Sequence, residues 1–485
     1  MNFKVLLIKP NILARKGFTS RGMMIPPIGL AYIAQSLIDI GCDTSIIDMV
    51  AEDPDNYWPL NETHDFWGMG DDALVKRIGE LEPDLIGIGG FTNQFGRIRD
   101  IAKIIKKRYG KLKIVIGGVH ATGLPRHTLE NIDADYLIIG DGEKPMTDLV
   151  TALHGGDMTV VESIDGLCWK KNGSTIINQR KYFNNDIDEL PWPGRALFNH
   201  TQYKAHNVPM PLITSRSCPL RCTFCGAHTI SGKKWRGRSP VDVADEVEYV
   251  VKRLGYKSVA FYDDAANVIS ERLVLICEEI ARRKLDFRLT IPSGLIIKYI
   301  TEELLLGLKK LGVIGIALSI EHSDEQMRNN VIKKKVSMEK IEKVIDLCEK
   351  HKLLALGNFV IGMPGETETT LQRLLTFIRE KSKKFSNISV FVATPFPGTE
   401  FYNQCLANGL IEDPAKNDFL DLDTYTPSIS LKGLPLDTLL QYKNEMERTF
   451  QMVRGPDYPS ERIREIFRKP NDKGARYVEK CYFAD

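Results

Sequence analysis

Short apolar runs alternate with amphipathic stretches along most of the chain, and the first block of this pattern spans residues 3–154. Near-continuous apolar runs are typical of strands that are buried on both faces of a sheet. The stretches between them carry apolar residues at helical spacing. We therefore predict a parallel, doubly wound sheet. Its predicted strands are 3–9, 43–48, 84–90, 112–117 and 135–139, and its predicted helices lie near 28–40, 71–81, 96–109 and 143–154.

Two segments interrupt this alternation. Residues 50–70 form a polar and aromatic insertion that is longer than a tight connection needs. Further on, residues 160–183 resemble a hairpin with Asn172-Gly173 at its turn, and LPWPG at 190–194 is rich in proline. We interpret the region 160–205 as the connection between two domains.

The alternation resumes at residue 211, where PLITSRS reads as a strand. Ser239 and Pro240 predict a helix start, with Ser as the N-cap and Pro at the first helical position. The six βα-type repeats fall short of the eight in a closed barrel, so we predict an open, partial barrel. The remaining predicted strands are 258–262, 287–291, 313–320, 354–361 and 387–393, and the predicted helices lie near 271–284, 301–311, 337–351 and 367–381.

The chain is thus predicted to be an α/β protein with a Rossmann-like domain, a linker, a partial barrel and a tail. The predicted boundaries are 1–158, 159–205, 206–428 and 429–485. The tail begins with a charged helical pattern. No apolar run approaches the length of a membrane span, and the N-terminus enters a strand-like run instead of a signal peptide. The 65 basic and 63 acidic residues give a net charge of +2, which disfavours a nucleic-acid surface.

Three of the nine cysteines lie together in SCPLRCTFCGA, directly after the first strand of the second domain. Cys218, Cys222 and Cys225 have the spacing Cys-x3-Cys-x2-Cys. A structural zinc site normally has four protein ligands, and a zinc site completed by His228 is one alternative. Chance clustering of structural cysteines is another. A [4Fe–4S] cluster with one iron open to a further ligand fits three thiolates best.

Here the sequence resembles the radical S-adenosylmethionine (SAM) superfamily, which carries CxxxCxxC after the first strand of a partial (β/α)6 barrel. The resemblance covers about 211–410 and implies that Cys218, Cys222 and Cys225 ligate the cluster, whose open iron chelates SAM. FYDD (261–264), SIEHSDEQM (319–327), NFVIGMPGET (358–367) and TPFPGTEFY (394–402) also resemble elements of this superfamily. By position, the residues implied to contact SAM are Phe224, Asp263 or Asp264, Glu321, Ile361 and Gly362.

The first domain adds a second resemblance. Glycines and polar residues follow its strands in FTN (91–93), GGVHAT (117–122) and GDGEKP (140–145), and ligands of doubly wound sheets bind at this edge. Together with PPIGLAYIAQSLIDIGCD (26–43) and DIDELPWPGRALF (186–198), these motifs resemble the cobalamin-binding domain of B12-dependent radical SAM proteins. The residues implied to line the cobalamin tail are Thr92, Gly117, Gly118, His120, Gly140 and Glu143.

One departure concerns the cobalt. The DxHxxG motif that often supplies a histidine to cobalt is absent, because the loop KPNILARKGFTSRGMMIPP (9–27) contains no histidine. The resemblance therefore implies cobalt without a histidine ligand and leaves the lower-face residue unassigned. His120 has an alternative as a turn residue bonded to the backbone.

The combined resemblance implies a cobalamin-dependent radical SAM C-methyltransferase. A 5′-deoxyadenosyl radical would abstract hydrogen from an unactivated carbon, and methylcobalamin would then methylate that carbon. One alternative is a cyclase or ring-rearranging enzyme with the same cofactors and no net methylation. Another is a methylthiotransferase, although its N-terminal domain needs three cysteines and residues 1–200 contain only Cys42 and Cys168. A non-enzymatic metal-binding or scaffold protein is the remaining class.

The implied substrate is a small molecule or a peptide residue, such as one in methyl-coenzyme M reductase. The implied partner is an electron donor such as ferredoxin or flavodoxin. An oxygen-sensitive cluster and the shortage of paired cysteines predict a reducing, anaerobic cytoplasm as the location. We predict no nucleic-acid partner and no membrane span.

Overall fold

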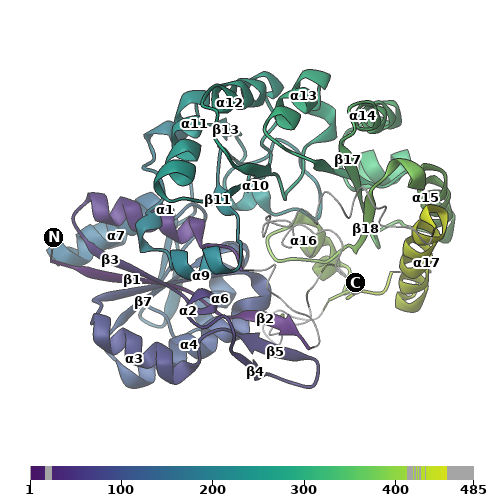
Figure 1. Cartoon of the computed structure of the whole chain (residues 1–485). Coiled ribbons are helices and arrows are strands. Elements are labelled where there is room, and N and C mark those ends of the chain that lie inside the picture. The colour runs from purple at the N-terminus through teal and green to yellow at the C-terminus, as the bar shows by residue number, and fades with distance from the viewer. Residues whose placement is uncertain are drawn as a thin grey trace.

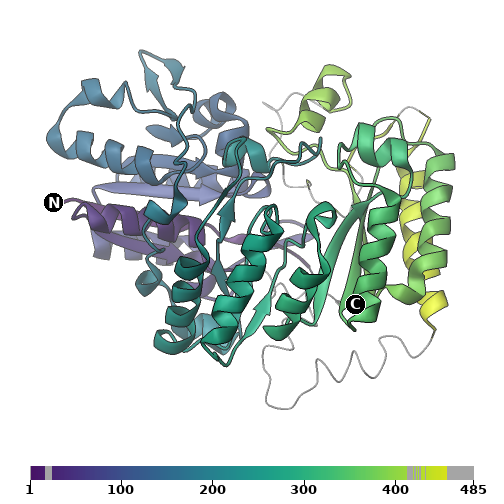
Figure 2. The ribbon, with the colours of Figure 1, turned by 90° about the horizontal axis from the view of Figure 1, so that it is seen from above.

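The computed structural model describes residues 2–16, 24–411 and 433–455, together with residues 419, 422, 424 and 428–431. A seven-stranded sheet and an open barrel lie side by side, as Figure 1 and Figure 2 show. In the described part of the chain, no helix is both long enough and apolar enough to cross a membrane.

The sheet of the first domain confirms the five predicted strands and adds a hairpin at one edge. Its order is β10-β9-β8-β7-β6-β1-β3, and the five strands from β8 to β3 run parallel. In chain order these five are arranged 2-1-3-4-5, which is a doubly wound order with its switch point between β1 and β6. The strands are β1 (Lys4–Lys9), β3 (Asp43–Asp48), β6 (Leu85–Gly90), β7 (Lys113–Gly118), β8 (Tyr136–Ile138), β9 (Leu167–Lys171) and β10 (Ser174–Ile177).

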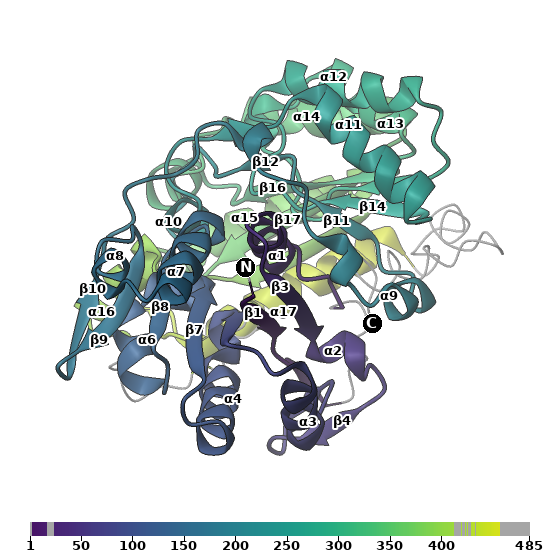
Figure 3. The ribbon, with the colours of Figure 1, turned by 90° about the vertical axis from the view of Figure 1, so that its left-hand side faces the viewer.

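Helices cover both faces of this sheet because its strands are apolar on both sides (Figure 3). In β1, Val5 and Leu7 pack against the layer of α1 and α7, whereas Leu6 and Ile8 pack against the layer of α3 and α4. Alternate side chains of a strand point to opposite faces, so one apolar run serves two cores. The helices are α1 (Ile28–Asp39), α3 (Asp71–Leu81), α4 (Phe95–Arg108), α5 (Val119–Gly123), α6 (Pro125–Asn131), α7 (Glu143–Gly155) and α8 (Met158–Val161).

Two segments differ from expectation. The predicted hairpin exists, with Asn172 and Gly173 at φ 50° and 77°, but it pairs with β8 and extends the first sheet. It is therefore part of the first domain's sheet and not a free connection, because β8 offers an unpaired edge to it. The insertion at 50–70 is ordered as well. It supplies α2 (Met49–Glu52), β4 (Tyr57–Pro59) and β5 (His64–Trp67), and β5 pairs with β2 (Ile12–Arg15).

The second domain has the six predicted parallel strands, but they form two sheets of three. The orders are β11-β14-β15 and β16-β17-β18, and a bridge between Leu295 and Leu318 joins the two sheets. The open barrel is thus divided at its middle. The strands are β11 (Met210–Leu212), β14 (Ser258–Phe261), β15 (Arg288–Thr290), β16 (Gly315–Glu321), β17 (Leu354–Ile361) and β18 (Asn387–Val392).

The run PLITSRS does not form one strand. It breaks after β11, and β12 (Ser215–Arg216) pairs antiparallel with β13 (Arg236–Gly237). The break occurs because the Thr214 N–H donates to the Asp263 carboxylate instead of to a strand. Ser239 caps α11 as predicted. The helices are α9 (His200–Ala205), α10 (Ala227–Ile230), α11 (Pro240–Glu248), α12 (Ser270–Arg282), α13 (Glu302–Lys310), α14 (Met338–Lys350), α15 (Glu368–Lys381), α16 (Glu400–Ala407) and α17 (Leu436–Arg454).

Buried ion pairs join the two domains. Arg216 lies two residues before Cys218, and its guanidinium donates to Glu143 at 2.5 Å, contacts Asp141 at 3.2 Å and covers the Tyr32 ring at 5.0 Å. The linker is held by a second group, in which Glu246 binds both Arg195 and Arg238. A buried pair fixes geometry strictly, because each charge needs its partner once water is excluded.

We predict that removing one member of the interdomain pair is costly. Glu143→Ala leaves the Arg216 guanidinium buried with less compensation, so the free energy of unfolding should fall by about 3–5 kcal/mol in urea titrations. The double variant Glu143→Leu/Arg216→Met removes both charges and should recover most of that loss. Equal destabilisation of the single and double variants would contradict the pairing.

Candidate functional site

The three motif cysteines lie on one loop after β12 and are reduced. Cys222 is buried, while Cys218 and Cys225 are half-buried. All three pack in one small apolar cluster with Phe224, and Ala265 and Ile296 also belong to it. Burial raises the pKa of the Cys222 thiol to about 12 and raises those of the other two thiols. A bound metal centre would have to displace these protons, as metals do at thiol sites.

The geometry bears on the choice between zinc and a cluster. Among the described residues, no three His, Cys, Asp or Glu side chains converge to hold one metal ion. A tetrahedral zinc site with His228 needs such convergence. In an iron–sulfur cubane each thiolate binds a different iron, so the sulfur atoms stand apart. The three cysteines and His228 thus form no ready-made single-ion site among the described residues.

A lysine that the sequence did not single out lies beside this loop. The N–H of Thr223 donates to the Ile332 carbonyl at 3.1 Å, and its hydroxyl donates to Val331 at 3.0 Å. The segment that follows buries Lys334, whose ammonium donates to Glu321 at 2.7 Å and acts electrostatically on Cys222 and Cys218. In the sequence Lys334 is hidden in a run of three lysines, which resembles an ordinary solvated surface.

Backbone strain accompanies the position of Lys334. Its neighbours Lys333 and Lys335 have φ values of 64° and 54°. Non-glycine residues adopt the left-handed region at a cost that the surrounding structure must offset. Arg328 supplies that support, because its buried guanidinium donates to the carbonyls of His322, Ser323 and Val336. The segment is therefore held in one conformation that directs Lys334 inward.

Glu321 ends β16 and is buried, with φ 67° at a break in the strand register. The next residue, His322, lies 3.0 Å from Glu366, whose other carboxylate oxygen accepts from the Gly362 N–H at 2.8 Å. The side chains that follow β16 and β17 thus lie against each other. The structure brings the predicted residues Glu321 and Gly362 to neighbouring strand ends on the same rim of the barrel, and Ile361 precedes Gly362 there.

The two aspartates of FYDD have different surroundings. Asp263 is 2% exposed, and one of its oxygens accepts from the Thr214 N–H, the Thr214 hydroxyl and the Ser215 hydroxyl at 2.9, 3.0 and 2.7 Å. Asp264 is exposed and lies close enough to affect Cys218 and Cys225 electrostatically. Asp263 therefore serves the fold, and Asp264 is the aspartate that is open to a ligand beside the cysteines.

In the first domain, His120 is an unusual buried group. It is 2% exposed, and neither of its ring nitrogens has a hydrogen-bond partner among the described residues. Its ring lies 4.6 Å from that of Phe95 and 5.0 Å from that of Phe419. Burial, with the neighbouring His127, lowers the pKa of His120 to about 3. The imidazole is neutral at physiological pH, and its unsatisfied nitrogens fit a polar ligand. The alternative of a backbone-bonded turn residue is not what the geometry shows.

The other predicted cobalamin residues fall into two groups. Thr92 is buried at the end of β6, and a Cβ atom on Gly117 at the end of β7 would meet no atom within 4 Å. Thr92 can thus offer its hydroxyl to a ligand, and Gly117 leaves room for one. By contrast, a Cβ on Gly118 would lie 2.6 Å from the Gly90 carbonyl, and one on Gly140 would lie 2.9 Å from that of Ile230. Gly118 therefore serves strand packing, while Gly140, like Glu143, serves the contact between the domains.

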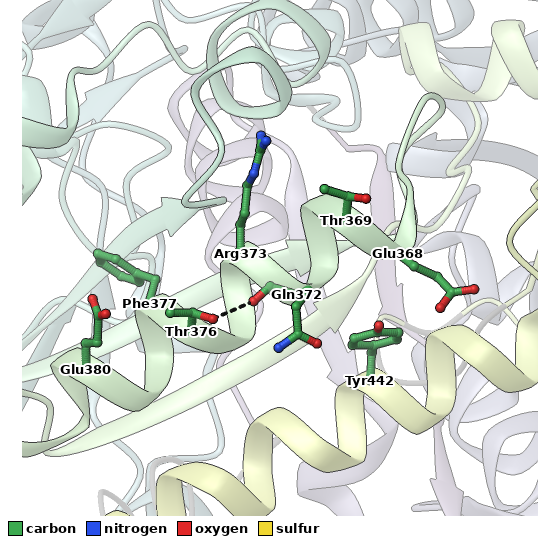
Figure 4. Close-up of a pocket in the computed structure, with 8 residues that line it drawn as sticks. All are labelled: Glu368, Thr369, Gln372, Arg373, Thr376, Phe377, Glu380 and Tyr442. Atoms are coloured by element: carbon green, nitrogen blue, oxygen red, sulfur yellow. Dashed lines mark hydrogen bonds between the residues drawn. The ribbon is translucent and has the colours of Figure 1, made fainter.

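A groove of about 560 Å³ elsewhere on the surface involves none of these residues. It lies between α15 and α17 (Figure 4). Thr376 in its wall donates to the backbone of its own helix, and Arg373 pairs with Asp324 at 2.7 Å. The groove is lined by Glu368, Thr369, Gln372, Arg373, Thr376, Phe377, Glu380 and Tyr442.

Comparison with known proteins agrees with the geometry of the two domains. The family model described as the radical SAM superfamily matches residues 212–378, and the B12 binding domain matches residues 15–150. An uncharacterized methyltransferase of Pyrococcus horikoshii is 30% identical over 388 residues, covering 80% of each chain. The chain belongs to the B12-dependent radical SAM enzymes. This family indicates a [4Fe–4S] cluster, SAM and cobalamin as its cofactors.

Other relatives of this B12-dependent radical SAM protein carry different names. Cytidylyl-2-hydroxyethylphosphonate methyltransferase of Streptomyces wedmorensis is 27% identical, covering 84% of this chain and 83% of its own. An anaerobic magnesium-protoporphyrin IX monomethyl ester cyclase of Rubrivivax gelatinosus is 24% identical, covering 83% and 70%. The solved structure of the radical SAM methyltransferase TsrM of Kitasatospora setae has the same fold, with a TM-score of 0.65 at 20% identity, covering 85% and 76%.

We predict that Asp263 is required for stability. Asp263→Ala leaves three buried donors without their acceptor and should lower the free energy of unfolding by about 2–4 kcal/mol. The exposed Asp264→Asn should change it by less than about 0.5 kcal/mol. Urea unfolding of the two variants checks this, and similar values for both would show that the distinction is wrong.

The titration of Asp263 gives a separate test. Burial raises its pKa from 3.8 to about 6. The protonated carboxyl is favoured in the folded state, so its contribution to stability is complete below pH 3.8 and is lost as the pH rises through 6. Asp263→Asn keeps a neutral acceptor and should flatten the pH dependence of unfolding in this window. An unchanged pH profile would assign the dependence to other groups.

Proposed function

We propose that the protein is a C-methyltransferase that acts on an unactivated carbon of a small molecule. The observation that carries the proposal is the contact between the segment after the cysteines, in the second domain, and the strand ends of the first domain's sheet. The loop that follows the cysteines packs on the C-terminal edge of the first sheet, where Gly140 approaches Ile230. The Thr229 hydroxyl donates to Gly398 at 2.9 Å, and Gly398 in turn lies against Gly123 after β7. A methyl donor on one domain and a hydrogen-abstracting centre on the other need this closeness.

In this proposal the barrel residues hold the cluster and SAM. Cys218, Cys222 and Cys225 ligate three irons. The amino acid part of SAM carries one ammonium and one carboxylate. Asp264 offers a negative charge beside the cysteines and Lys334 a positive one, so the two can hold both groups in a fixed orientation. Glu321 orients Lys334 and meets the ribose, while Phe224, Ile361 and Gly362 contact the adenine.

The first domain holds cobalamin in the same proposal. Thr92, Gly117 and His120 line the cobalamin tail, since they combine a hydroxyl, open space and two unsatisfied nitrogens. Gly118 keeps the ends of β6 and β7 close together, and Gly140 and Glu143 act indirectly by fixing the domains. The bound groups supply a hydrogen-abstracting radical and a transferable methyl group. The chain supplies orientation and excludes water.

A second candidate function is a radical cyclisation or rearrangement without net methylation. Its support is the relative named as a cyclase, which matches most of this chain. The methylthiotransferase alternative has the weaker support, because the N-terminal domain holds only Cys42 and Cys168. Modification of a peptide residue, such as one in methyl-coenzyme M reductase, stays a prediction that no contact in the structure tests.

Isotope transfer separates the two main candidates. The reconstituted enzyme, a reductant and SAM with a trideuteromethyl group are incubated anaerobically with a small-molecule extract of host cells that lack the gene. A methyltransferase should give 5′-deoxyadenosine and one metabolite that carries the labelled methyl group. A metabolite that changes structure without gaining the label would favour the cyclase. A labelled methylthio group would favour the third class.

We predict that variants at Cys225 and at Asp264 lose different properties. Cys225→Ala should abolish the charge-transfer absorbance of the cluster and SAM cleavage. Asp264→Ala should keep the cluster absorbance but weaken SAM binding by roughly ten- to a hundredfold, the value of one charge-assisted hydrogen bond. Asp263→Asn is the matched control and should bind SAM normally. SAM binding that depends on Asp263 instead would contradict the assignment.

We also predict that a side chain at the end of β7 excludes cobalamin. Gly117→Val fills open space, and the cobalt-to-protein ratio after reconstitution should fall at least about tenfold while the cluster stays intact. Gly155→Val on α7 adds the same side chain where nothing lies within 4 Å and should retain cobalamin. Normal cobalamin content in Gly117→Val would remove this residue from the proposed site.

A further inference from the structure

An aromatic side chain from the second domain's part of the chain is buried in the first domain. Phe419 follows α16 in the sequence and precedes α17. A little further on, the carbonyl of Thr424 accepts from the Val392 N–H at the end of β18, at 2.8 Å. Phe419 itself is 3% exposed and belongs to the apolar core that α3 and α4 cover in the first domain. Its ring therefore reaches across from one domain into the other.

Three rings of the first domain surround the Phe419 ring. Its centroid lies 5.0 Å from that of His120, 5.7 Å from that of His127 and 5.8 Å from that of Phe95, and all three contacts are edge-on. Phe95 begins α4, whereas the two histidines lie on α5 and α6, which follow β7. We call the space bounded by Phe95, His120 and His127 the aromatic pocket. Phe419 fills it.

Phe419 matches the shape of the aromatic pocket but not its chemistry. Both ring nitrogens of His120 lack a hydrogen-bond partner among the described residues, and a phenyl ring can supply none. Buried polar groups nearly always have a partner, because leaving one unsatisfied is unfavourable. The backbone of Phe419 is also strained, with φ 57°. The pocket therefore fits a flat ring that carries a hydrogen-bonding atom better than it fits phenyl.

We propose that Phe419 fills the aromatic pocket as a stand-in for the aromatic base at the end of the cobalamin tail, and that bound cobalamin displaces it. The inference rests on the proposed function, which assigns His120 to the cobalamin tail. The benzimidazole base is flat and aromatic like phenyl, and its free ring nitrogen can accept from an N–H of His120. The exchange is non-covalent, so no bond forms or breaks.

The alternative is that Phe419 is a permanent wall of the cofactor site. Aromatic rings with centroids 5.0–5.8 Å apart are in contact, so no further ring fits between Phe419 and its three neighbours. Displacement also has a thermodynamic consequence that a wall lacks. The pocket is available only in the fraction of molecules that Phe419 has left, and the affinity for cobalamin is reduced by that fraction. Removing the ring therefore strengthens binding if it is a stand-in and weakens binding if it is a wall.

Two corrinoids test the proposal on the full-length protein with its cluster reconstituted and no cobalamin loaded. Hydroxocobalamin carries the nucleotide tail, whereas cobinamide has the same corrin ring without the nucleotide and its base. Phe419→Ala should bind hydroxocobalamin at least about tenfold more tightly than the unchanged protein, by absorbance titration, and should change the affinity for cobinamide by less than about twofold. Weaker binding of hydroxocobalamin would show a wall, and an equal gain for both corrinoids would exclude competition with the base.

Leu422→Ala is the matched control. Leu422 lies three residues further along and packs, partly buried, against the same core. Its truncation removes packing from the same segment but leaves the Phe419 ring in place, so the affinity for hydroxocobalamin should stay within about twofold of that of the unchanged protein. The same gain in both variants would assign the effect to a loosened segment and overturn the proposal.

A spectroscopic readout tests the displacement with the pocket intact, and it holds even if Phe419→Ala does not fold. The protein carries para-fluorophenylalanine at position 419 and is followed by fluorine NMR. Hydroxocobalamin should move the signal to a solvent-exposed environment, seen as a shift between light and heavy water, and cobinamide should not. A signal that stays buried while hydroxocobalamin binds would overturn this inference alone. Failure of the unchanged protein to bind either corrinoid would overturn the cofactor assignment and this inference with it.

Discussion

The ion pair of Arg216 with Glu143 and Asp141 is the constraint on which the arrangement of both domains depends. Arg216 lies in β12, two residues before the first motif cysteine, and its partners lie at the start of α7. The first domain is therefore tied to the second directly at the cysteine loop. An error in the packing of one domain is transmitted to the position of the loop, since a buried charge cannot shift without losing its partner.

A second set of polar contacts connects the strand ends of the barrel to one another. Asp263 joins β14 to the start of the cysteine loop, and His322 lies 3.0 Å from Glu366 between the ends of β16 and β17. Lys334 adds a contact beneath the loop through Glu321. These groups lie at the C-terminal rim of the strands, where parallel sheets place their ligands. The barrel itself is an apolar core, and its rim is a network that fixes charged side chains.

The strands and helices could be predicted from the sequence because their apolar periodicity is local. The short spacing of the three cysteines likewise predicted that they lie together, and the structure packs them in one cluster, while their role as ligands stays a prediction. The sequence did not predict the role of a residue where that role depends on contacts with distant residues. Nothing in FYDD separates a buried Asp263 from an exposed Asp264, and Lys334 stands in a run of lysines. Glu143 follows a strand like a ligand residue, yet its partner Arg216 comes from the other domain. The hairpin at Asn172 was recognised from its turn, but its pairing with β8 was not.

The contact of Gly123 with Pro397 and Gly398 limits how far the two domains can be moved apart by changes in side chains. A Cβ on Gly123 would lie 2.6 Å from the Pro397 carbonyl, so two main chains touch there with no side chain between them. Trimming side chains cannot widen the junction at this point, because none is left to trim. A wider gap between the domains at this point would require one domain to tilt as a body, so the contact sets the closest approach of the two domains.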